Sequence, residues 1–446
     1  MTIKQLHVTV LSNLHIAYDK YTRSYDKSKL PSITYPGVFF LLHESSIDIG
    51  INKAQALLET LAYPGNELIA LETSIAESDL IPNEFTGTGL GQYIESSSIV
   101  VNAIYTIRNK KLLPLRMEEA MAKAYRVMQP SSSSYSDLVP RSVSVLPVAR
   151  GCQAKCSFCF SSSSISTLQR KNSIDFERVH QVFSQAKQAG AIRGVITGGG
   201  EPGLLPRTQL HKLIQISQTY FDKTVLISNG YFVSSAANVE QALLDLDNQG
   251  LTVLAISRHH FDDQKCQSIM NLNVDFERVH SAYKTITPHL AGLRLRLVCV
   301  MQKDGVDSAE TIERYISWAA QMGIEQICFK ELYVSTSTES LFYENEANTW
   351  SYDNQVPLSL LVCHAREQNW SMAATLPWGS PVYEVERYGR RMSIAAYTEP
   401  SLSWELEHKL CRSWNLMADG RCFASLESED SEVIVRESVY ELPNVS

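Results

Sequence analysis

Three cysteines close together in the chain are the residues whose type and spacing could do chemistry. Cys152, Cys156 and Cys159 stand at the spacing C-x3-C-x2-C, directly after an apolar run, Val143–Val148, that predicts a strand. Three thiolates on one short loop can hold three irons of a cubane [4Fe–4S] cluster and leave the fourth iron open to a small molecule. A zinc site would need a fourth ligand, and no close Cys/His pair follows nearby in the sequence. The spacing therefore favours a cluster, with a zinc site or a redox-active thiol loop as the alternatives.

A second motif follows the next predicted strand, Ile192–Thr197. Glycines at the end of a strand let the backbone approach a ligand closely, and the acidic residue among them adds a carboxylate at the same place. The motif consists of Gly198, Gly199, Gly200, Glu201 and Pro202. With the cysteine loop before it, this turn resembles the paired motifs of the radical S-adenosylmethionine (SAM) superfamily.

The resemblance implies a function and two cofactors. In that family a C-x3-C-x-aromatic-C loop binds a [4Fe–4S] cluster, and a Gly-Gly-x-Glu-Pro-like turn contacts the methionine amino group of SAM. The implied enzyme cleaves SAM reductively to a 5′-deoxyadenosyl radical, which abstracts a hydrogen atom from a substrate. Phe158 stands at the aromatic position, where we expect it to shield the cluster from water.

Composition limits the remaining classes of function. The chain has 446 residues, 44% of them hydrophobic and 20% charged, which is ordinary for a globular protein of two or three domains. A net charge of −8 gives no electrostatic footprint for nucleic acid, and no apolar run is long enough to span a bilayer. We expect no nucleic-acid or membrane partner. A reducing cytoplasm suits an oxygen-sensitive cluster, so we expect a cytoplasmic protein.

The middle of the chain alternates between strand-like and helix-like segments, which predicts a parallel sheet. The predicted strands are Val143–Val148, Ile192–Thr197, Thr224–Ser228, Leu251–Ser257, Leu293–Val300 and Gln326–Glu331. The predicted helices are Phe176–Ala189, Thr208–Tyr220, Ala236–Asn248, Phe276–Thr287 and Ala309–Met322. We predict an α/β protein with a partial (β/α)6 barrel at 141–335, which the family resemblance also implies. An N-terminal accessory region of unknown role (1–135) precedes it, and a C-terminal extension (336–446), similar to a degenerate twitch region, follows it.

Polar residues follow most of the predicted strands. Parallel barrels carry their chemistry at the carboxyl ends of the strands, so these positions are candidate ligand contacts. Ser228 and Asn229 resemble the family's Ser/Thr-Asn-Gly segment, which implies a place near SAM, with Asn229 near the ribose. Ser257 and Arg258 could hold the SAM carboxylate, because a guanidinium matches a carboxylate fork; a surface salt bridge is the alternative.

Three further residues are candidates for contact with the substrate. His259 and His260 could touch the substrate or move a proton, or they could cap the next helix. Glu331 could bind substrate or SAM, or form an ion pair at the barrel rim. Each of the three has a structural alternative that the sequence leaves open.

The C-terminal segment from Leu410 to Cys422 predicts a cysteine, a strand, a turn at Asp419-Gly420 and a second strand. This segment is similar to that of the molybdenum cofactor biosynthesis protein A group and of SPASM/twitch enzymes, in which cysteines bind an auxiliary cluster. Trp414 replaces one cysteine of that pattern, so a full auxiliary cluster is disfavoured. Cys411 could instead donate a hydrogen atom to a substrate radical, or pack as a small apolar group.

The sequence does not identify the substrate. We expect a small-molecule biosynthetic substrate, such as a nucleotide, sugar or amino-acid derivative. One alternative is a ribosomal-peptide maturase, an epimerase or a crosslinking enzyme, whose N-terminal region holds a leader peptide. A third class is a non-catalytic iron–sulfur or zinc protein. An enzyme would also need a reductant such as flavodoxin or ferredoxin.

Overall fold

In the computed structural model the chain folds into two compact units. One unit is Met1–Ser133 with Pro400–His408, and the other is Ser134–Glu399 with Lys409–Ser446. The structure describes residues 7–12, 15–18, 37–43, 68–75, 99–108, 111–114, 135–148, 151–160, 174–334, 346–400, 405–406, 408–426 and 431–435.

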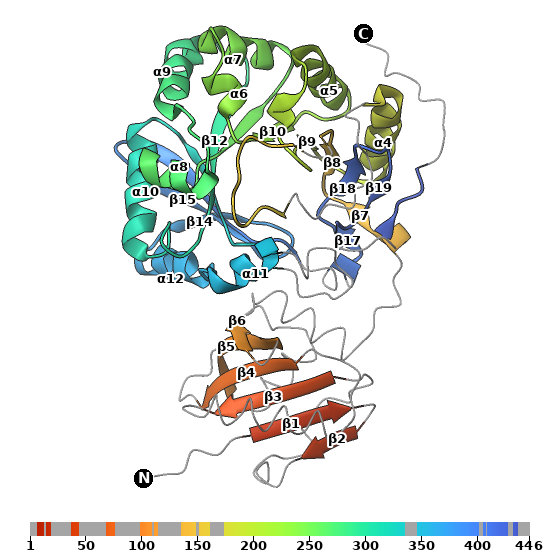
Figure 1. Ribbon diagram of the computed structural model, residues 1–446, viewed down its shortest axis with the longest axis vertical. Helices are drawn as coiled ribbons and strands as arrows, with labels where there is room; N and C mark the ends of the chain where they lie inside the picture. Colours follow the sequence, from red (N-terminus) through yellow and green to blue (C-terminus); the bar gives the residue numbers. More distant parts are fainter. Residues whose placement is uncertain are drawn as a thin grey trace. The chain divides into compact units, whose positions relative to one another are not determined.

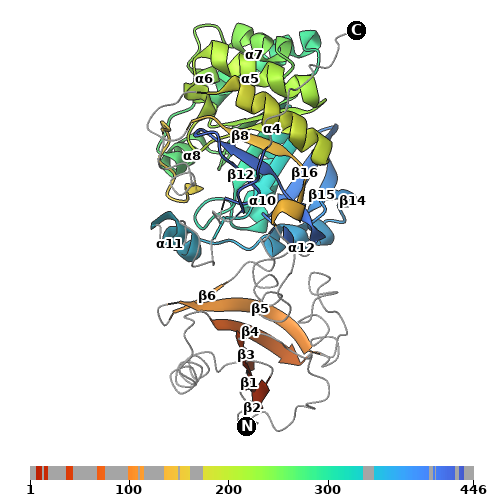
Figure 2. The same cartoon turned by 90° about the vertical axis from the view of Figure 1, so that its right-hand side faces the viewer.

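The first unit contains a six-stranded sheet in the order β2-β1-β3-β4-β5-β6, which Figure 2 shows from β6 to β2. β3 and β4 are parallel, and the other neighbours are antiparallel. The strands are β1 His7–Ser12, β2 His15–Tyr18, β3 Gly37–His43, β4 Leu68–Ile75, β5 Ile99–Arg108 and β6 Lys111–Pro114. β2 and β6 are the end strands of this sheet as far as the structure describes it.

The second unit contains the predicted parallel sheet. Neighbouring strands pair in parallel from β8 to β13, in chain order. The strands are β8 Val143–Leu146, β9 Gly194–Ile196, β10 Thr224–Ser228, β11 Val253–Ser257, β12 Arg294–Val300 and β13 Gln326–Lys330. The main helices are α4 Phe176–Ala189, α5 Arg207–Tyr220, α7 Val239–Asn248, α9 Phe276–Ile286 and α10 Ala309–Gln321. Figure 1 shows α5, α7, α9 and α10 in an arc outside these strands, so the α/β prediction is confirmed.

Segments after the predicted barrel lengthen this sheet at both edges. β16 (Arg390–Tyr397) pairs in parallel with β13, and β18 (Trp414–Met417) pairs in parallel with β8. β16 also forms a hairpin with β15 (Pro381–Arg387), which pairs with β14 (Ser371–Thr375), while β18 turns back into β19 (Cys422–Phe423). The hairpin predicted around Asp419-Gly420 is confirmed. The parallel partnership of β16 and β18 with the barrel strands was not predicted.

Short elements lie between the larger ones. Near the ends of the central strands these are η7 Pro202–Leu204, α6 Tyr231–Ser234, α8 Asp263–Met270, η8 Thr287–His289, α11 Glu346–Asp353 and α12 Ser359–Glu367. The others are η4 Tyr135–Asp137, β7 Val139–Pro140 and β17 Leu410–Cys411, with β7 and β17 forming a two-stranded parallel pair.

Alternation along the strands separates two faces of the sheet, because successive side chains point to opposite faces. In β12, Leu295, Leu297 and Cys299 are buried, and Arg294 and Arg296 alternate with them on the other face. The face that carries Arg294 and Arg296 is the inner face of the barrel. On it Val225, Val253 and Ala255 form an apolar cluster with side chains of neighbouring strands. The part of the chain that the structure describes has no helix long and apolar enough to cross a membrane.

Candidate functional site

The cysteine loop follows β8 and is held by backbone hydrogen bonds from two directions. The amide of Glu201 donates to the carbonyl oxygen of Gly151 at 2.8 Å. The amide of Lys155 donates to the carbonyl oxygen of Met270, at the end of α8, also at 2.8 Å. The loop therefore lies between the turn that follows β9 and the helix that follows β11.

The glycine turn is packed so tightly that it excludes side chains. A Cβ atom on Gly198 would lie 1.6 Å from the carbonyl oxygen of Gly200, and one on Gly200 would lie 2.3 Å from the carbonyl oxygen of Gly151. Real Cβ atoms essentially never come closer than 3.0 Å to another heavy atom. Glycine at 198 and 200 is therefore needed for the turn itself and for its contact with the cysteine loop.

Glu201 joins the ends of two strands. Its Oε1 accepts from the amide of Gly203 at 2.7 Å and from the hydroxyl of Ser228 at 2.6 Å, and its Oε2 accepts from the amide of Asn229 at 2.8 Å. The side chain is 3% exposed, and burial raises its pKa although these hydrogen bonds oppose the shift. Three hydrogen-bond donors of the protein thus occupy the Glu201 carboxylate. The family resemblance implies that the turn containing this residue contacts the amino group of SAM. In this structure Glu201 positions the two turns, and Pro202 begins η7 beside it.

Asn229 touches the cysteine loop through its side chain. Its Nδ2 donates to the Sγ of Cys152 at 3.5 Å and to Oε1 of Gln153 at 3.2 Å, while its Oδ1 accepts from the amide of Tyr231 at 2.9 Å. The structure therefore brings together the cysteine loop, the glycine turn, Ser228 and Asn229. The contact of Asn229 with a ribose stays a prediction.

The three thiols of the loop are close enough to affect one another. Burial, then the neighbouring Cys159 and Cys152, raise the pKa of Cys156 to about 12. Among the residues that the structure describes, no group of three or more His, Cys, Asp or Glu side chains could hold a metal ion. In a cubane cluster each thiolate binds a different iron, so the three sulfurs need not converge on one point. Three soft sulfur donors on one short loop fit such a cationic cluster.

The guanidinium of Arg258 is used in contacts within the protein, and its predicted hold on the SAM carboxylate stays a prediction. Its guanidinium donates to the carbonyl oxygen of Phe261 at 2.9 Å and pairs with Asp263 at 2.5 Å. It also lies over the rings of Phe276 and Trp318, with centroid distances of 5.5 and 5.2 Å. Alternation after β11 turns Arg258 toward the helices, and its side chain is only 4% exposed.

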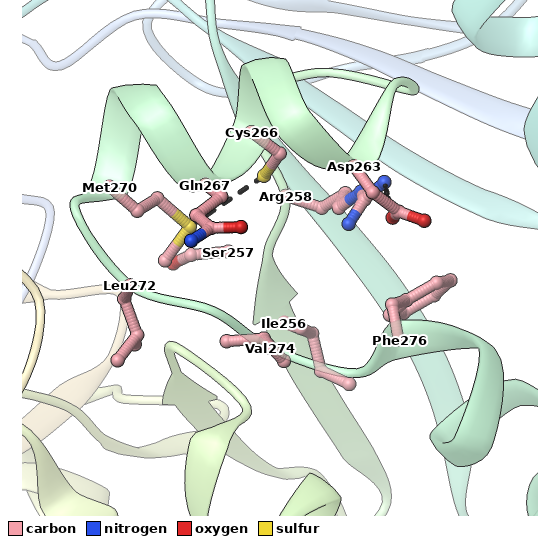
Figure 3. A pocket seen from close by; sticks show the side chains of 10 residues that line it. All are labelled: Ile256, Ser257, Arg258, Asp263, Cys266, Gln267, Met270, Leu272, Val274 and Phe276. Carbon is pink, nitrogen blue, oxygen red and sulfur yellow. Dashed lines mark hydrogen bonds and ion pairs between the residues drawn. The ribbon is translucent and has the colours of Figure 1, made fainter.

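Figure 3 shows the pocket between the end of β11, α8 and the segment that leads into α9. Arg258 and Asp263 point toward each other at one side of it. Ser257 lies at the other side, near Cys266 and Met270, whose sulfur atoms are 3.8 Å apart. Because the end of α8 is bonded to the cysteine loop, this pocket and Ser257 remain close to the candidate site.

The rings of His259 and His260 both make hydrogen bonds within the protein through Nδ1. Nδ1 of His259 accepts from the amide of Val300 at 3.1 Å, and the ring packs edge-on against Phe158 at 5.1 Å. Burial, with a smaller contribution from Arg258, lowers the pKa of His259 to about 3, so the ring is neutral near pH 7 and unsuited to carry a proton there. Nδ1 of His260 accepts from the amide of Asp262 in the turn before α8, and burial lowers its pKa. Asp262, not a histidine, is the N-cap of that helix.

Glu331 also holds the barrel rim together. Its carboxylate accepts from the amide of Leu358 at 3.3 Å and from the hydroxyl of Thr398 at 3.0 Å, and the residue is 6% exposed. These bonds connect the end of β13 with the start of α12 and the end of β16. Its neighbour Lys330 forms an ion pair with Glu399.

Cys411 is at the wrong end of the barrel for hydrogen-atom donation at the mouth. It is fully buried in β17, which pairs with β7 just before β8 begins. The amino ends of the parallel strands face away from the cysteine loop. Packing as a small apolar group, the alternative in the sequence, fits this position. Cys422 is likewise fully buried, and Cys363 is exposed.

An ion network that the sequence did not reveal lies on the inner face of the sheet. Glu399 pairs with Lys330 at 2.5 Å and with Arg412 at 2.6 Å, and accepts from the hydroxyl of Tyr397 at 3.0 Å. Burial alone would raise the pKa of Glu399, but Arg412 and Lys330 together lower it to about 2. The partners come from β13, β16 and the residue after β17, so no local spacing could have predicted the network.

Comparison with known proteins gives one family and several distant structures. The family description of the radical SAM superfamily matches residues 146–290. No curated protein sequence matches the chain. A solved structure of Streptococcus suis SuiB bound to precursor peptide SuiA is 14% identical, with 70% of this chain and 65% of that chain covered at a TM-score of 0.42. The match thus spans a little less than two thirds of that SuiB chain.

Two other solved structures show the same pattern of weak likeness. Coproporphyrinogen III oxidase (HemN) from Escherichia coli is 13% identical over 55% of this chain and 65% of that chain, at a TM-score of 0.30. A radical SAM methyltransferase from Sphaerobacter thermophilus is 16% identical over 47% of this chain and 62% of that chain, at a TM-score of 0.33. At TM-scores this low the structures add nothing to the argument, and the likeness to the molybdenum cofactor group stays a prediction.

The family match covers the cysteine loop, the glycine turn and strands β9 to β11, whose geometry is given above. On that match, residues 146–290 form a radical SAM domain, and members of that superfamily are enzymes that use a [4Fe–4S] cluster and SAM.

Proposed function

We propose that the chain binds a [4Fe–4S] cluster through Cys152, Cys156 and Cys159 and uses it to cleave SAM reductively. The observation that carries this proposal is the direct contact of the cysteine loop with the glycine turn, through the hydrogen bond from Glu201 to Gly151. When bound, the cluster and SAM would together supply a 5′-deoxyadenosyl radical that removes a hydrogen atom from the substrate.

The residues around the loop would bind and orient the cluster and SAM, and would exclude water from them. The turn from Gly198 to Gly200 has no side chains and lies against the cysteine loop, so backbone groups of the turn would face a ligand bound there. The ring of Phe158 packs against His259 at 5.1 Å and Trp350 at 6.0 Å, and this aromatic group covers one side of the cysteine loop. A flavodoxin or ferredoxin would supply the electron, in a reducing cytoplasm.

We propose a small-molecule biosynthetic substrate bound on the inner face of the barrel. Lys330, Tyr397 and Glu399 form a charged network there, and Arg296 donates twice to the amide oxygen of Gln326, at 3.1 and 2.8 Å. Phe329, which alternates with Lys330, packs instead against Tyr315 of α10. An inner face that combines apolar side chains with a few charged groups suits a polar nucleotide, sugar or amino-acid derivative.

The second candidate is a ribosomal-peptide maturase. The N-terminal sheet forms a unit of its own, and β2 and β6 are its end strands within the described residues. An extended peptide can add to the edge of a sheet through main-chain hydrogen bonds, which gives this unit a means of holding a leader peptide. Another protein, SuiB, has been solved bound to the precursor peptide SuiA.

One experiment separates these substrates and tests the enzyme class. The protein is purified without oxygen, reconstituted with iron and sulfide, and given SAM, dithionite and extract of the native cell. The measured product is 5′-deoxyadenosine above the no-extract background, with the Cys156→Ala protein as the blank.

Each outcome has a defined meaning. Stimulation that survives protease and passes a small-molecule filter supports the first substrate class, whereas stimulation that protease abolishes supports the peptide maturase. A reconstituted protein that forms no 5′-deoxyadenosine under any of these conditions contradicts radical SAM activity and favours a non-catalytic iron–sulfur protein.

A further inference from the structure

We propose that Asn229 sets the reduction potential of the cluster by donating a hydrogen bond to Cys152. This inference rests on the proposed function, because it takes Cys152 as a cluster ligand. It assigns Asn229 a task different from the ribose contact that the family resemblance implies. Asn229 acts through Cys152 and is therefore a positioning residue.

The direction of the Asn229 amide is fixed by its other hydrogen bonds. Oδ1 accepts from the amide of Tyr231 at 2.9 Å, so the NH2 group must point the other way, toward the cysteine loop. The backbone amide of Asn229 is held by Oε2 of Glu201 at 2.8 Å, and the residue is 5% exposed. Both the backbone and the side chain of Asn229 are thus constrained before a cluster binds.

The turn that contains Asn229 leaves little freedom for another arrangement. Gly230 has a φ of 83°, in the left-handed region, and a Cβ atom there would lie 2.9 Å from the Cγ2 of Ile256. The hydroxyl of Ser228 donates to Glu201 and accepts from the amide of Gly230 at 2.9 Å. The tight turn therefore presents Asn229 in one orientation to the loop.

The NH2 group has two protons, and the structure gives each an acceptor. One is the Sγ of Cys152 at 3.5 Å, and the other is Oε1 of Gln153 at 3.2 Å. Because both acceptors belong to the cysteine loop, one asparagine from the end of β10 orients a ligand sulfur and its neighbour together.

A hydrogen bond to a ligand sulfur changes the energy of the electron that the cluster accepts. Reduction adds a negative charge that is shared with the sulfur ligands, and a donor stabilises the more negative state more strongly. Removal of the donor should therefore make the cluster harder to reduce. We expect roughly a tenfold fall in the equilibrium constant for reduction, which is about 59 mV for a one-electron couple.

The test is a redox titration of the reconstituted protein without SAM, followed by electron paramagnetic resonance. The variants are Asn229→Asp and Asn229→Ala. Asp keeps an oxygen for the amide of Tyr231 and nearly the same shape, but it cannot donate to the sulfur. The matched control is Asn238→Ala, because Asn238 caps α7 through the amide of Gln241.

The expected result is full iron and sulfide content in Asn229→Asp with a more negative midpoint potential, and an unchanged potential in Asn238→Ala. If Asn229→Ala fails to fold or to assemble a cluster, the midpoint potential of the cluster in Asn229→Asp tests the inference. A wild-type potential in a fully loaded Asn229→Asp protein overturns this inference and leaves the proposed function standing. A wild-type protein that assembles no cluster overturns both.

Discussion

The amide of Glu201 donates to the carbonyl oxygen of Gly151 at 2.8 Å, and a Cβ atom on the neighbouring Gly200 would lie 2.3 Å from the same oxygen. The turn after β9 and the loop after β8 are therefore built against each other, with no room for a side chain between them. A change in the turn should therefore displace the cysteine loop that would bind the cluster.

Gly200→Ala should lower cluster occupancy although it changes no ligand. The added methyl group must displace the carbonyl of Gly151, which directly precedes Cys152. We expect at least a severalfold loss of iron per chain after reconstitution, measured by iron and sulfide assay. Gly292→Ala is the control, because a Cβ atom there meets nothing within 4 Å. Equal iron content in the two variants would contradict the account of the turn.

His259→Gln should change how the stability of the cluster-free protein depends on pH. The pKa of His259 is lowered from 6.5 to about 3, so the unfolded chain binds the proton first as the pH falls. The stability from neutral His259 is fully present above pH 6.5 and is lost as the pH falls toward 3, by about 2 kcal/mol at pH 5.

The measurement is urea unfolding of wild type and variant at pH 8 and pH 5. His259→Gln should be less stable at pH 8, and the difference should narrow at pH 5. The control is His289→Gln, which makes the same replacement at an exposed position. A difference for His259→Gln that stays constant over this range would mean that the buried ring does not remain neutral.

Glu399→Gln should strongly destabilise the barrel at pH 7. The change leaves Lys330 and Arg412 without their buried carboxylate, and breaking a buried pair in this way costs about 3–5 kcal/mol. Glu384→Gln removes the partner of the exposed Arg391 and should cost much less, because solvent screens that pair. Denaturant unfolding of the two variants measures the contrast.

The same pair of variants has a pH signature. The pKa of Glu399 is lowered from 4.5 to about 2, so its stabilisation is complete above pH 4.5 and is lost as the pH falls toward 2. The gap between wild type and Glu399→Gln should therefore shrink at pH 3.5. An equal cost for Glu399→Gln and Glu384→Gln at pH 7 would show that the network contributes nothing special.

Local patterns predicted the helices and the central strands, because their causes lie within a few residues. The hexapeptide Asp-Phe-Glu-Arg-Val-His, which occurs at 175–180 and again at 275–280, illustrates this. Asp175 and Asp275 each accept from the amide three residues later, at 3.0 and 2.9 Å, as N-caps of α4 and α9. The two apolar runs before the cysteine loop and the glycine turn were recognisable for the same reason.

Partnerships between distant segments could not be predicted in this way. β16 and β18 join opposite edges of the parallel sheet, and nothing in their own sequence specifies β13 or β8 as the neighbour. The sequence assigned Glu201 to a ligand because two of its three donors, Ser228 and Asn229, come from the end of another strand. Only the fold likewise brings Arg258 its partners, which are Asp263, Phe276 and Trp318.

The measurement that tests the central claim most directly is SAM cleavage by Cys156→Ala. Wild type, Cys156→Ala and Cys363→Ala are reconstituted without oxygen, and iron content and 5′-deoxyadenosine are measured with SAM and dithionite. Cys363 is exposed and lies outside the loop, so Cys363→Ala should match wild type. The account predicts loss of the cluster and of 5′-deoxyadenosine in Cys156→Ala alone, and a Cys156→Ala protein that still cleaves SAM at the wild-type rate would contradict it.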